Sequence, residues 1–158
     1  MVRKAIQNDI EKIGEIYTAA RAFMRATGNP TQWSGGYPSR ELTEQDIKDG
    51  KLYVVEQNGA LHGVFYFNIG EDPTYLKIDG AWESDAPYGV IHRIASDGTA
   101  RGVFSEALGF CTEQISHIRI DTHEDNKVMQ NVLLRHGFCF CGIIYLENGD
   151  PRRAYELK

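Results

Sequence analysis

The fold is decided by one stretch of the chain, which reads Tyr88-Gly89-Val90-Ile91-His92-Arg93-Ile94-Ala95-Ser96-Asp97-Gly98-Thr99-Ala100-Arg101-Gly102-Val103-Phe104-Ser105-Glu106-Ala107-Leu108. Val90 to Ala95 is β-branched and bounded by a glycine and by Ser96-Asp97-Gly98, which predicts a buried strand. Past the loop, apolar residues from Val103 to Cys111 recur at helical spacing. A strand therefore leads through a small-residue turn into a helix, whose free N–H groups and dipole favour an anion.

A second unit of the same kind follows. Ile118 to Thr122 predicts another short strand, His123 to Asn126 a polar turn, and Lys127 to His136 a helix that leads through Gly137-Phe138 into a further strand. Taken alone, the single glycine at Gly102 indicates ordinary packing of a strand against a helix more often than a phosphate-binding loop. Two such units in succession make the phosphate-binding interpretation stronger.

Together the two units resemble the GNAT acetyltransferase superfamily. In that family a Val-x-Pro-x-x-Arg-Gly-x-Gly-x-Gly stretch ends one strand and opens the acetyl-CoA helix. Ile94 stands at the position of the valine and Gly102 at that of the central glycine, whereas Thr99 replaces a Gln or Arg and Phe104 replaces the last glycine. The order of predicted elements also resembles the family nearly end to end.

The family's next helix carries Asn-x-x-Ala and is followed by Gly-Phe. Asn126 matches the asparagine, Met129 replaces the small residue, and Gly137-Phe138 match fully. The tyrosine that often serves as general acid in the family falls at Leu133. The resemblance implies an α/β (α+β) fold with a mixed, mostly antiparallel central sheet flanked by helices.

Length and composition agree with one soluble domain over residues 1–158. The net charge of -5 argues against general binding to nucleic acid or to a membrane surface. No apolar stretch is long enough to span a bilayer, and the first ten residues lack the apolar core of a signal peptide, so we expect a cytoplasmic protein. Monomer and homodimer both remain open.

The three cysteines are Cys111, Cys139 and Cys141. They form neither a Cys-x-x-Cys motif nor a Cys/His zinc pattern, so we expect reduced thiols and no metal. Because side chains alternate along a strand, Cys139 and Cys141 are expected on one face, buried in the core.

The remaining elements follow from local pattern. We expect a strand over Val2 to Ile6, a helix capped by Asn8 or Asp9, a second helix begun by Ser39, and a hairpin with its turn at Gln57-Asn58-Gly59. Two further strands are expected, over Cys139 to Leu146 and Arg153 to Leu157, and a strand or extended segment over Tyr75 to Trp82.

The resemblance implies acetyl-CoA as the acyl donor. The strand containing Ile91 to Ala95 would pair with the pantetheine arm, with the N–H of Ile94 or Ala95 polarising the thioester carbonyl. The amides around Ala100 to Phe104 would hold the pyrophosphate, with Arg101 nearby. The expected cofactor-binding residues are Ile94, Ala95, Thr99, Ala100, Arg101, Gly102, Val103, Phe104, Asn126 and Met129.

Three residues are candidates for the general base or acid. His92 shares a strand face with Ile94, and a histidine titrates in the range that an amine's proton transfer requires, although a histidine in such a strand is more often a hydrogen-bonded core residue. Tyr145 is a candidate general acid in place of the tyrosine that the family's helix often supplies. His123, at a strand exit, is the third candidate, and its alternative role is to cap a turn or lie in solvent. Direct deprotonation of the amine through water needs none of these three residues.

The acceptor pocket is expected from loops. Trp33 and Tyr37 lie in an aromatic, glycine-rich loop that would line a binding site or plug the edge of the core. Glu83, in an acidic loop, would recognise a cationic acceptor or be solvated. The sequence thus predicts an acetyl-CoA-dependent N-acetyltransferase that moves an acetyl group to a primary amine, of a small molecule or a peptide, by direct nucleophilic attack.

Two alternatives stay open. Leu133, Thr99 and Phe104 favour a non-catalytic acyl-CoA-binding sensor or scaffold of the same fold. Phe104 and Met129 would also suit a different acyl chain.

Overall fold

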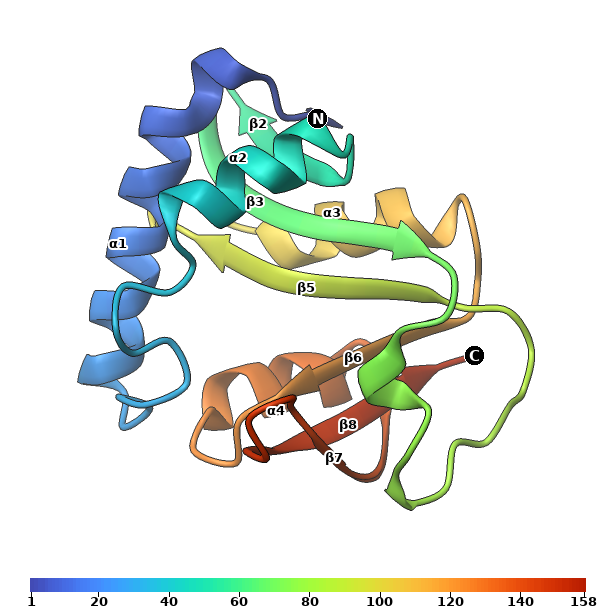
Figure 1. Cartoon of the computed structure of the whole chain (residues 1–158). Coiled ribbons are helices and arrows are strands. Elements are labelled where there is room, and N and C mark those ends of the chain that lie inside the picture. The colour runs from blue at the N-terminus through green and yellow to red at the C-terminus, as the bar shows by residue number, and fades with distance from the viewer.

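Eight strands form one sheet in the computed structural model, which describes residues 1–158 (Figure 1). The strand order is β1-β2-β3-β5-β6-β8-β7-β4, and every neighbouring pair is antiparallel except β5 and β6. The expected mixed, mostly antiparallel sheet is therefore confirmed. The strands are β1 (Val2–Lys4), β2 (Leu52–Gln57), β3 (Ala60–Ile69), β4 (Asp79–Gly80), β5 (Gly89–Ser96), β6 (Ile118–Thr122), β7 (Cys139–Tyr145) and β8 (Pro151–Leu157). The helices are α1 (Ile10–Ala26), α2 (Arg40–Lys48), α3 (Val103–Thr112) and α4 (Lys127–Arg135).

Local sequence signals account for most element boundaries. Asn58 and Gly59 take φ angles of 51° and 78°, the left-handed conformations that a two-residue turn between β2 and β3 requires. The Ser39 hydroxyl accepts from the Leu42 amide and caps α2. Asp9 directly precedes α1, but its carboxylate accepts from the Ile6 amide and from Arg3 instead of capping the helix. These contacts fix the ends of the helices that cover the sheet.

The helices lie on two faces of the sheet. On one face, α3 and α4 pack on a core that contains Phe65, Ile91 and Tyr155. On the other, α1 covers β2, β3 and β5 through a second cluster that includes Tyr17 and Trp33. Figure 1 shows α1 and α2 in front of one half of the sheet, with α3 and α4 behind. The other half of the front face has no helix.

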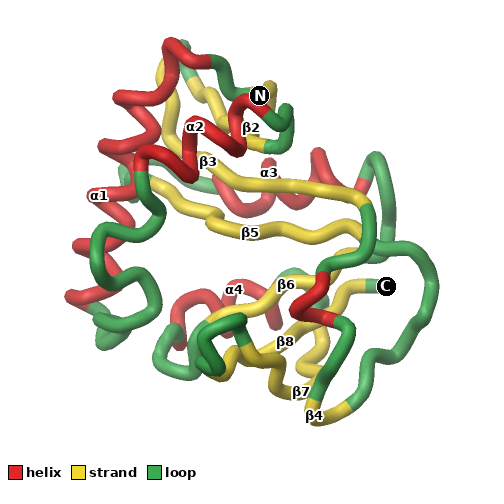
Figure 2. The backbone as a smooth tube through the Cα atoms, in the orientation of Figure 1, coloured by secondary structure: helices red, strands yellow, loops and turns green.

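A long loop covers that half. Of the strand or extended segment expected over Tyr75 to Trp82, only Asp79–Gly80 pairs with the sheet, whereas Pro73–Tyr75 forms a 3-10 turn. The Asp72 side chain caps the turn by accepting from the Thr74 amide. Tyr75 is 1% exposed and packs in a third cluster against β5, β7 and β8. The loop runs from β3 to β5 past β4, as the green segments of Figure 2 show.

The cysteines are free, but they do not share one environment. Cys111 is buried in the core beneath α3, whereas Cys139 is exposed and Cys141 is partly buried. The expectation that both Cys139 and Cys141 are buried is therefore wrong for Cys139. The β7–β8 register shifts between Phe140 and Gly142, so a bulge at Cys141 breaks the alternation on which the expectation depended.

None of the helices combines the length and the apolar character that crossing a membrane requires.

The contact between β3 and α3 is tight at Gly63. A Cβ built there would lie 2.4 Å from Cγ1 of Val103, at the start of α3. We expect Gly63→Ala to lower the free energy of unfolding by about 1–3 kcal/mol, because the helix must shift. Urea unfolding measures the change. Gly109→Ala is the matched control, since a Cβ there meets nothing within 4 Å and alanine favours the helix by about 0.5–1 kcal/mol.

Candidate active site

The two halves of the sheet separate between β5 and β6. The strands pair only at Gly89 with Ile118 and at Val90 with Arg119, and beyond these residues they diverge, as Figure 1 shows. A cavity of about 660 Å³ opens there. Its walls come from β5, β6, the start of α4, the loop between α1 and α2, and the turn between β7 and β8. From Ile91 onward, β5 therefore presents an edge with no strand partner.

A bulge redirects β5 at the cavity wall. Tyr66 pairs with His92 and Val64 with Ala95, so β5 has an extra residue opposite β3. Arg93 takes a φ of 50°, which is strained for a residue with a long side chain. Its guanidinium binds the buried Asp46 of α2 through Nε at 3.0 Å and Nη2 at 2.9 Å. This buried ion pair holds the bulge in place.

The start of α3 carries unpaired backbone donors. No intramolecular acceptor lies within hydrogen-bond reach of any amide from Ala100 to Ser105. Gly102 takes a φ of 74°, and a Cβ built on it meets nothing within 4 Å. Left-handed backbone followed by a helix start is a concave anion-binding arrangement, and the residues present fit a phosphate group there. The amides predicted to hold a pyrophosphate are thus free to do so.

The loop before these amides is held by its own side chains. Asp97 accepts from the Thr99 amide at 2.9 Å and the Thr99 hydroxyl at 2.8 Å, and His62 Nδ1 lies 3.1 Å from its carboxylate. Burial opposes ionisation of Asp97, but these bonds lower its pKa overall. Thr99 therefore shapes the loop through its side chain. Ala100 and Phe104 pack against the core, and Arg101 is exposed.

His92 lies in the cavity between two carboxylates. Its Nε2 is 2.7 Å from Oδ2 of Asp72, and its Nδ1 is 4.0 Å from Oδ2 of Asp121. The Tyr75 hydroxyl donates to the same Asp121 oxygen at 2.6 Å. Because an ionised Asp72 only accepts, Nε2 carries the proton, and Nδ1 of the neutral ring keeps its lone pair. The lone pair therefore lies on the side of Asp121.

The pKa values of the neighbours fit this arrangement. Burial opposes ionisation of Asp72, but the hydrogen bonds from His92 and Thr74 outweigh it and lower the pKa to about 2. Burial and the adjacent Asp121 raise the pKa of Tyr75 well above its ordinary value. At neutral pH the cluster thus contains an ionised Asp72 and a protonated Tyr75.

The loop after α1 joins the two halves of the sheet across the cavity. The side-chain oxygen of Gln32 accepts from Asn29 at 2.8 Å and from Asn126 at 3.0 Å. Asn126 also caps α4 by accepting from the Met129 amide. Trp33 is 8% exposed and packs edge-on against Tyr17, yet it also lines the cavity with Tyr37. Trp33 is thus both a core residue and part of the cavity wall.

The structure brings some of the predicted residues together and separates others. The predicted residues that line the cavity are His92, Ile94, Asn126, Met129, Trp33 and Tyr37. Of the predicted catalytic and acceptor-binding residues, Tyr145, His123 and Glu83 do not line it; of the predicted cofactor-binding residues, Ala95 and residues 99–104 lie outside its lining. The Tyr145 hydroxyl donates to Asp79 at 2.6 Å on the far edge of the sheet, and Glu83 pairs with Lys158 at 3.1 Å. Nδ1 of His123 accepts from the Asp125 amide, which is the turn-capping alternative.

Sequence reasoning missed Asp72, Asp121, Tyr75 and Arg152, which all belong to the cavity or its wall. Asp121 gave a signal, as a carboxylate that follows the apolar Ile120 in a predicted strand. Asp72 and Tyr75 come from a loop and turn whose fold is set by distant contacts, and Arg152 lies in β8.

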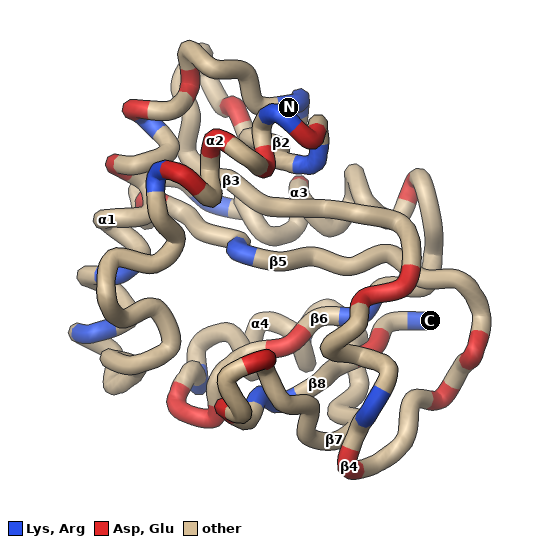
Figure 3. Tube along the Cα trace, viewed as in Figure 1, with Lys and Arg blue, Asp and Glu red and all other residues tan.

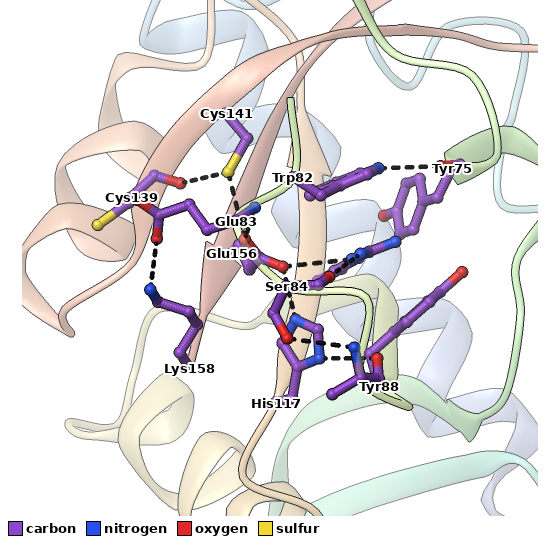
Figure 4. Close-up of polar contacts among 12 residues, drawn as sticks. Tyr75, Trp82, Glu83, Ser84, Tyr88, His117, Cys139, Cys141, Glu156 and Lys158 are labelled. Atoms are coloured by element: carbon purple, nitrogen blue, oxygen red, sulfur yellow. Dashed lines mark hydrogen bonds and ion pairs between the residues drawn. The ribbon is translucent and has the colours of Figure 1, made fainter. Parts of the chain in front are cut away.

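A buried ionic cluster anchors the long loop between β3 and β5 to the sheet (Figure 4). Glu156 is 1% exposed and accepts from His117 Nε2 at 2.6 Å and from the Glu83 amide at 2.8 Å. Burial opposes ionisation of Glu156, but these bonds lower its pKa. Arg119 lies between the rings of Trp82 and Tyr88, 4.1 Å from each centroid. The cluster fixes the loop that carries Asp72 and Tyr75.

Comparison with solved structures identifies this architecture as that of acetyltransferases. A GNAT-family acetyltransferase from Streptococcus agalactiae is 32% identical, with 99% of this chain and 94% of that chain covered and a TM-score of 0.89. A GNAT-family acetyltransferase from Listeria monocytogenes is 26% identical over 99% and 94% of the two chains, with a TM-score of 0.67. A putative acetyltransferase from Staphylococcus aureus is 23% identical over 99% and 97%, with a TM-score of 0.71.

No family model and no curated protein matches the sequence. The likeness at 32% identity over nearly the whole of both chains nevertheless shows the family. The chain belongs to the GNAT family, and its relatives support acetyl transfer as the general class of reaction.

The Asp72 interaction predicts a pH dependence of stability. Its pKa falls from 3.8 to about 2 on folding, so the folded state binds fewer protons than the unfolded state below about pH 4. Stability is thus present above that pH and is lost as pH falls toward 2, by about 2 kcal/mol in total. We expect Asp72→Asn to flatten this acid dependence, measured by urea unfolding at several acidic pH values. Asp85→Asn, at an exposed position, should leave it unchanged.

Proposed function

We propose that the protein is an acetyl-CoA-dependent N-acetyltransferase that acetylates a primary amine by direct nucleophilic attack. The observation that carries this proposal is the run of unpaired amides from Ala100 to Ser105, at the end of a strand whose free edge borders the cavity. The amides at the start of α3 and the free edge of β5 are both backbone hydrogen-bonding groups without a partner in the chain. Together they suit an extended ligand that ends in phosphates.

The donor side uses the backbone. The amides at the start of α3 would bind the pyrophosphate, and the free edge of β5 would pair with the pantetheine arm as an added strand does. Ile94 lines the cavity, and its amide or that of Ala95 would polarise the thioester carbonyl. Because these are backbone contacts, Thr99 and Phe104 in place of family residues do not remove them.

The acceptor side uses His92 and the two aspartates. His92 Nδ1 and Asp121 Oδ2 are 4.0 Å apart, so one amine nitrogen can lie within about 3 Å of both. Asp121 would attract the ammonium group, and His92 would accept its proton before attack. Asp72 acts as a positioning residue, because its bond to Nε2 directs the lone pair of Nδ1 into the site.

A covalent route through cysteine has little support. Burial raises the pKa of the Cys111 thiol to about 12, and burial together with Glu156 does the same for Cys141. The thiolate is the nucleophile, so such thiols are poor ones. None of the three cysteines lines the cavity.

The second candidate is a non-catalytic acyl-CoA-binding module. Leu133 favours it, because this residue has no exposed surface and cannot supply the acid that the family's tyrosine often supplies. Tight acetyl-CoA binding without acceptor-dependent CoA release, over a broad amine panel, supports this module. Calorimetry that detects no acetyl-CoA binding to the folded protein contradicts both candidates.

Gly102→Val tests the phosphate-binding amides. We expect acetyl-CoA affinity to fall about tenfold or more, because a β-branched residue disfavours the φ of 74° and distorts the donors. Calorimetric titration measures the dissociation constant. Gly59→Val is the control, since Gly59 takes a φ of 78° in the turn between β2 and β3 and does not line the cavity. Equal affinity in the two variants means that Gly102 only shapes the turn.

His92→Ala tests the base. We expect kcat to fall about 100-fold or more at neutral pH, because general bases typically contribute 10²–10⁴-fold. The acid limb of the pH–rate profile should disappear with the imidazole. His123→Ala provides the comparison, since His123 was the competing candidate and does not line the cavity. An acid limb that survives in His92→Ala and is lost in His123→Ala assigns the base to His123.

A further inference from the structure

One arginine in the cavity wall has no anionic partner. Arg152 of β8 lines the cavity and is 7% exposed. Its Nη1 donates to the carbonyl oxygen of Pro151 at 2.8 Å, and no ion pair forms within 4.0 Å of the guanidinium. A guanidinium has five N–H donors and stays charged, so its burial without an anion is costly. Its remaining donors are available to an anion that enters the cavity.

Two other arginines of the sheet are paired with carboxylates. Arg93 has Asp46 at 2.9 Å, and Arg119 has Glu156 at 3.5 Å. The next residue, Arg153, has no ion pair, but it lies over the ring of Phe140, 4.0 Å from its centroid, and does not line the cavity. Of the two arginines that line the cavity, Arg93 and Arg152, only Arg152 therefore lacks a carboxylate partner.

Arg152 shares a face of the sheet with the proposed amine site. Asp121 pairs with Ala154, and Arg152 precedes Ala154 by two residues, so the side chains of Asp121 and Arg152 lie on the same face. Diagonal neighbours of this kind are roughly 7–8 Å apart at Cα. The separation matches a small molecule that carries an amine and an acid group close together.

We propose that the acceptor is a small amine that also carries a carboxylate, as an amino acid does. Its amine lies between His92 and Asp121, and its carboxylate pairs with Arg152. This inference rests on the transferase function proposed above and narrows its acceptor. Arginine suits the role because its planar fork binds a carboxylate through two hydrogen bonds.

The acidic residues at the cavity raise a competing expectation. Glu147 and Asp150 also line the cavity, and with Asp72 and Asp121 they would attract a polyamine. Glu147 and Asp150 are exposed, however, so solvent screens them, whereas Arg152 is buried. A polyamine would leave the buried guanidinium unpaired and would add positive charge beside it. Figure 3 shows acidic and basic positions near one another around the gap between β5 and β6, which suits a zwitterion.

Paired acceptors test the proposal. CoA release by the full chain is measured at saturating acetyl-CoA with the standard amino acids, each beside its α-amide, and with putrescine and spermidine. We expect kcat/KM to be at least about tenfold higher for the preferred amino acid than for its amide, because only the acid makes the charged bonds. Arg152→Gln should raise the KM for that acid about tenfold or more and leave the KM for the amide unchanged.

Two further variants separate recognition from folding. Arg152→Lys keeps the charge and should recover part of the preference for the acid, and Arg153→Gln is the matched control on the opposite face. Thermal unfolding and acetyl-CoA affinity report whether each variant is folded. A variant that fails to fold leaves the wild-type comparison of acids with amides as the test.

The proposal is overturned by equal kcat/KM for acids and amides, by preference for polyamines, or by an Arg152→Gln effect of the same size on both members of a pair. It is also overturned when acetyl-CoA binds but no carboxylate-bearing amine in the panel is acetylated. Failure of acetyl-CoA to bind contradicts the transferase function instead. Calorimetric titration of amino acids and their amides then tests Arg152 on its own, with preference for the acids expected and its absence contradicting the inference.

Discussion

The whole site depends on the point at which β5 and β6 stop pairing. Their parallel ladder ends at Val90 and Arg119, and at its closed end Gly89 packs so tightly that a Cβ would lie 2.6 Å from the Phe67 ring. Beyond that point each strand keeps its other neighbour. β5 pairs with β3, and Arg93 of β5 binds Asp46 of α2, whereas β6 pairs with β8. The free edge of β5 and the cavity both follow from the end of this ladder.

One short turn spans the opening that results. Pro73–Tyr75 follows directly on Asp72, whose carboxylate binds His92 on β5, and Tyr75 at its end binds Asp121 on β6. The amide of Asp72 in turn donates to the Tyr88 hydroxyl at 2.9 Å. The turn therefore contacts both His92 and Asp121, the two side chains that face each other across the cavity. It does so from a loop that the ionic cluster around Glu156 holds against the sheet.

The sequence predicts the parts of this molecule that local chemistry decides. Hydrophobic period and turn residues place the hairpin at Asn58-Gly59, the strand Ile118–Thr122 and the helix start at Gly102. The segment from Tyr75 to Trp82 defeats the same reasoning. Tyr75, Ile78 and Trp82 pack on distant strands from a 3-10 turn and a loop, while Leu76 is exposed, and local spacing does not record this arrangement. The bulge at Cys141 likewise reverses the expected burial of Cys139.

The site likewise has one part that local sequence predicts and another that depends on distant contacts. The backbone donors around Gly102 follow from a strand, a turn and a helix that are consecutive in the chain. The charged cluster joins residues from Asp72 to Asp121, whose proximity exists only once the sheet has formed. His92 was found because a histidine in an apolar strand stands out, whereas Tyr145 and Glu83 were plausible by residue type but lie outside the cavity.

The Gln32 contacts have a consequence for how the cavity keeps its width. The loop after α1 meets α4 through side-chain amides, with Gln32 accepting from both Asn29 and Asn126. Amides carry no net charge and do not titrate in the physiological range, so neither ionic strength nor pH acts on this bridge directly. This contact across the cavity is thereby independent of the solution conditions that act on the charged groups of the proposed amine site.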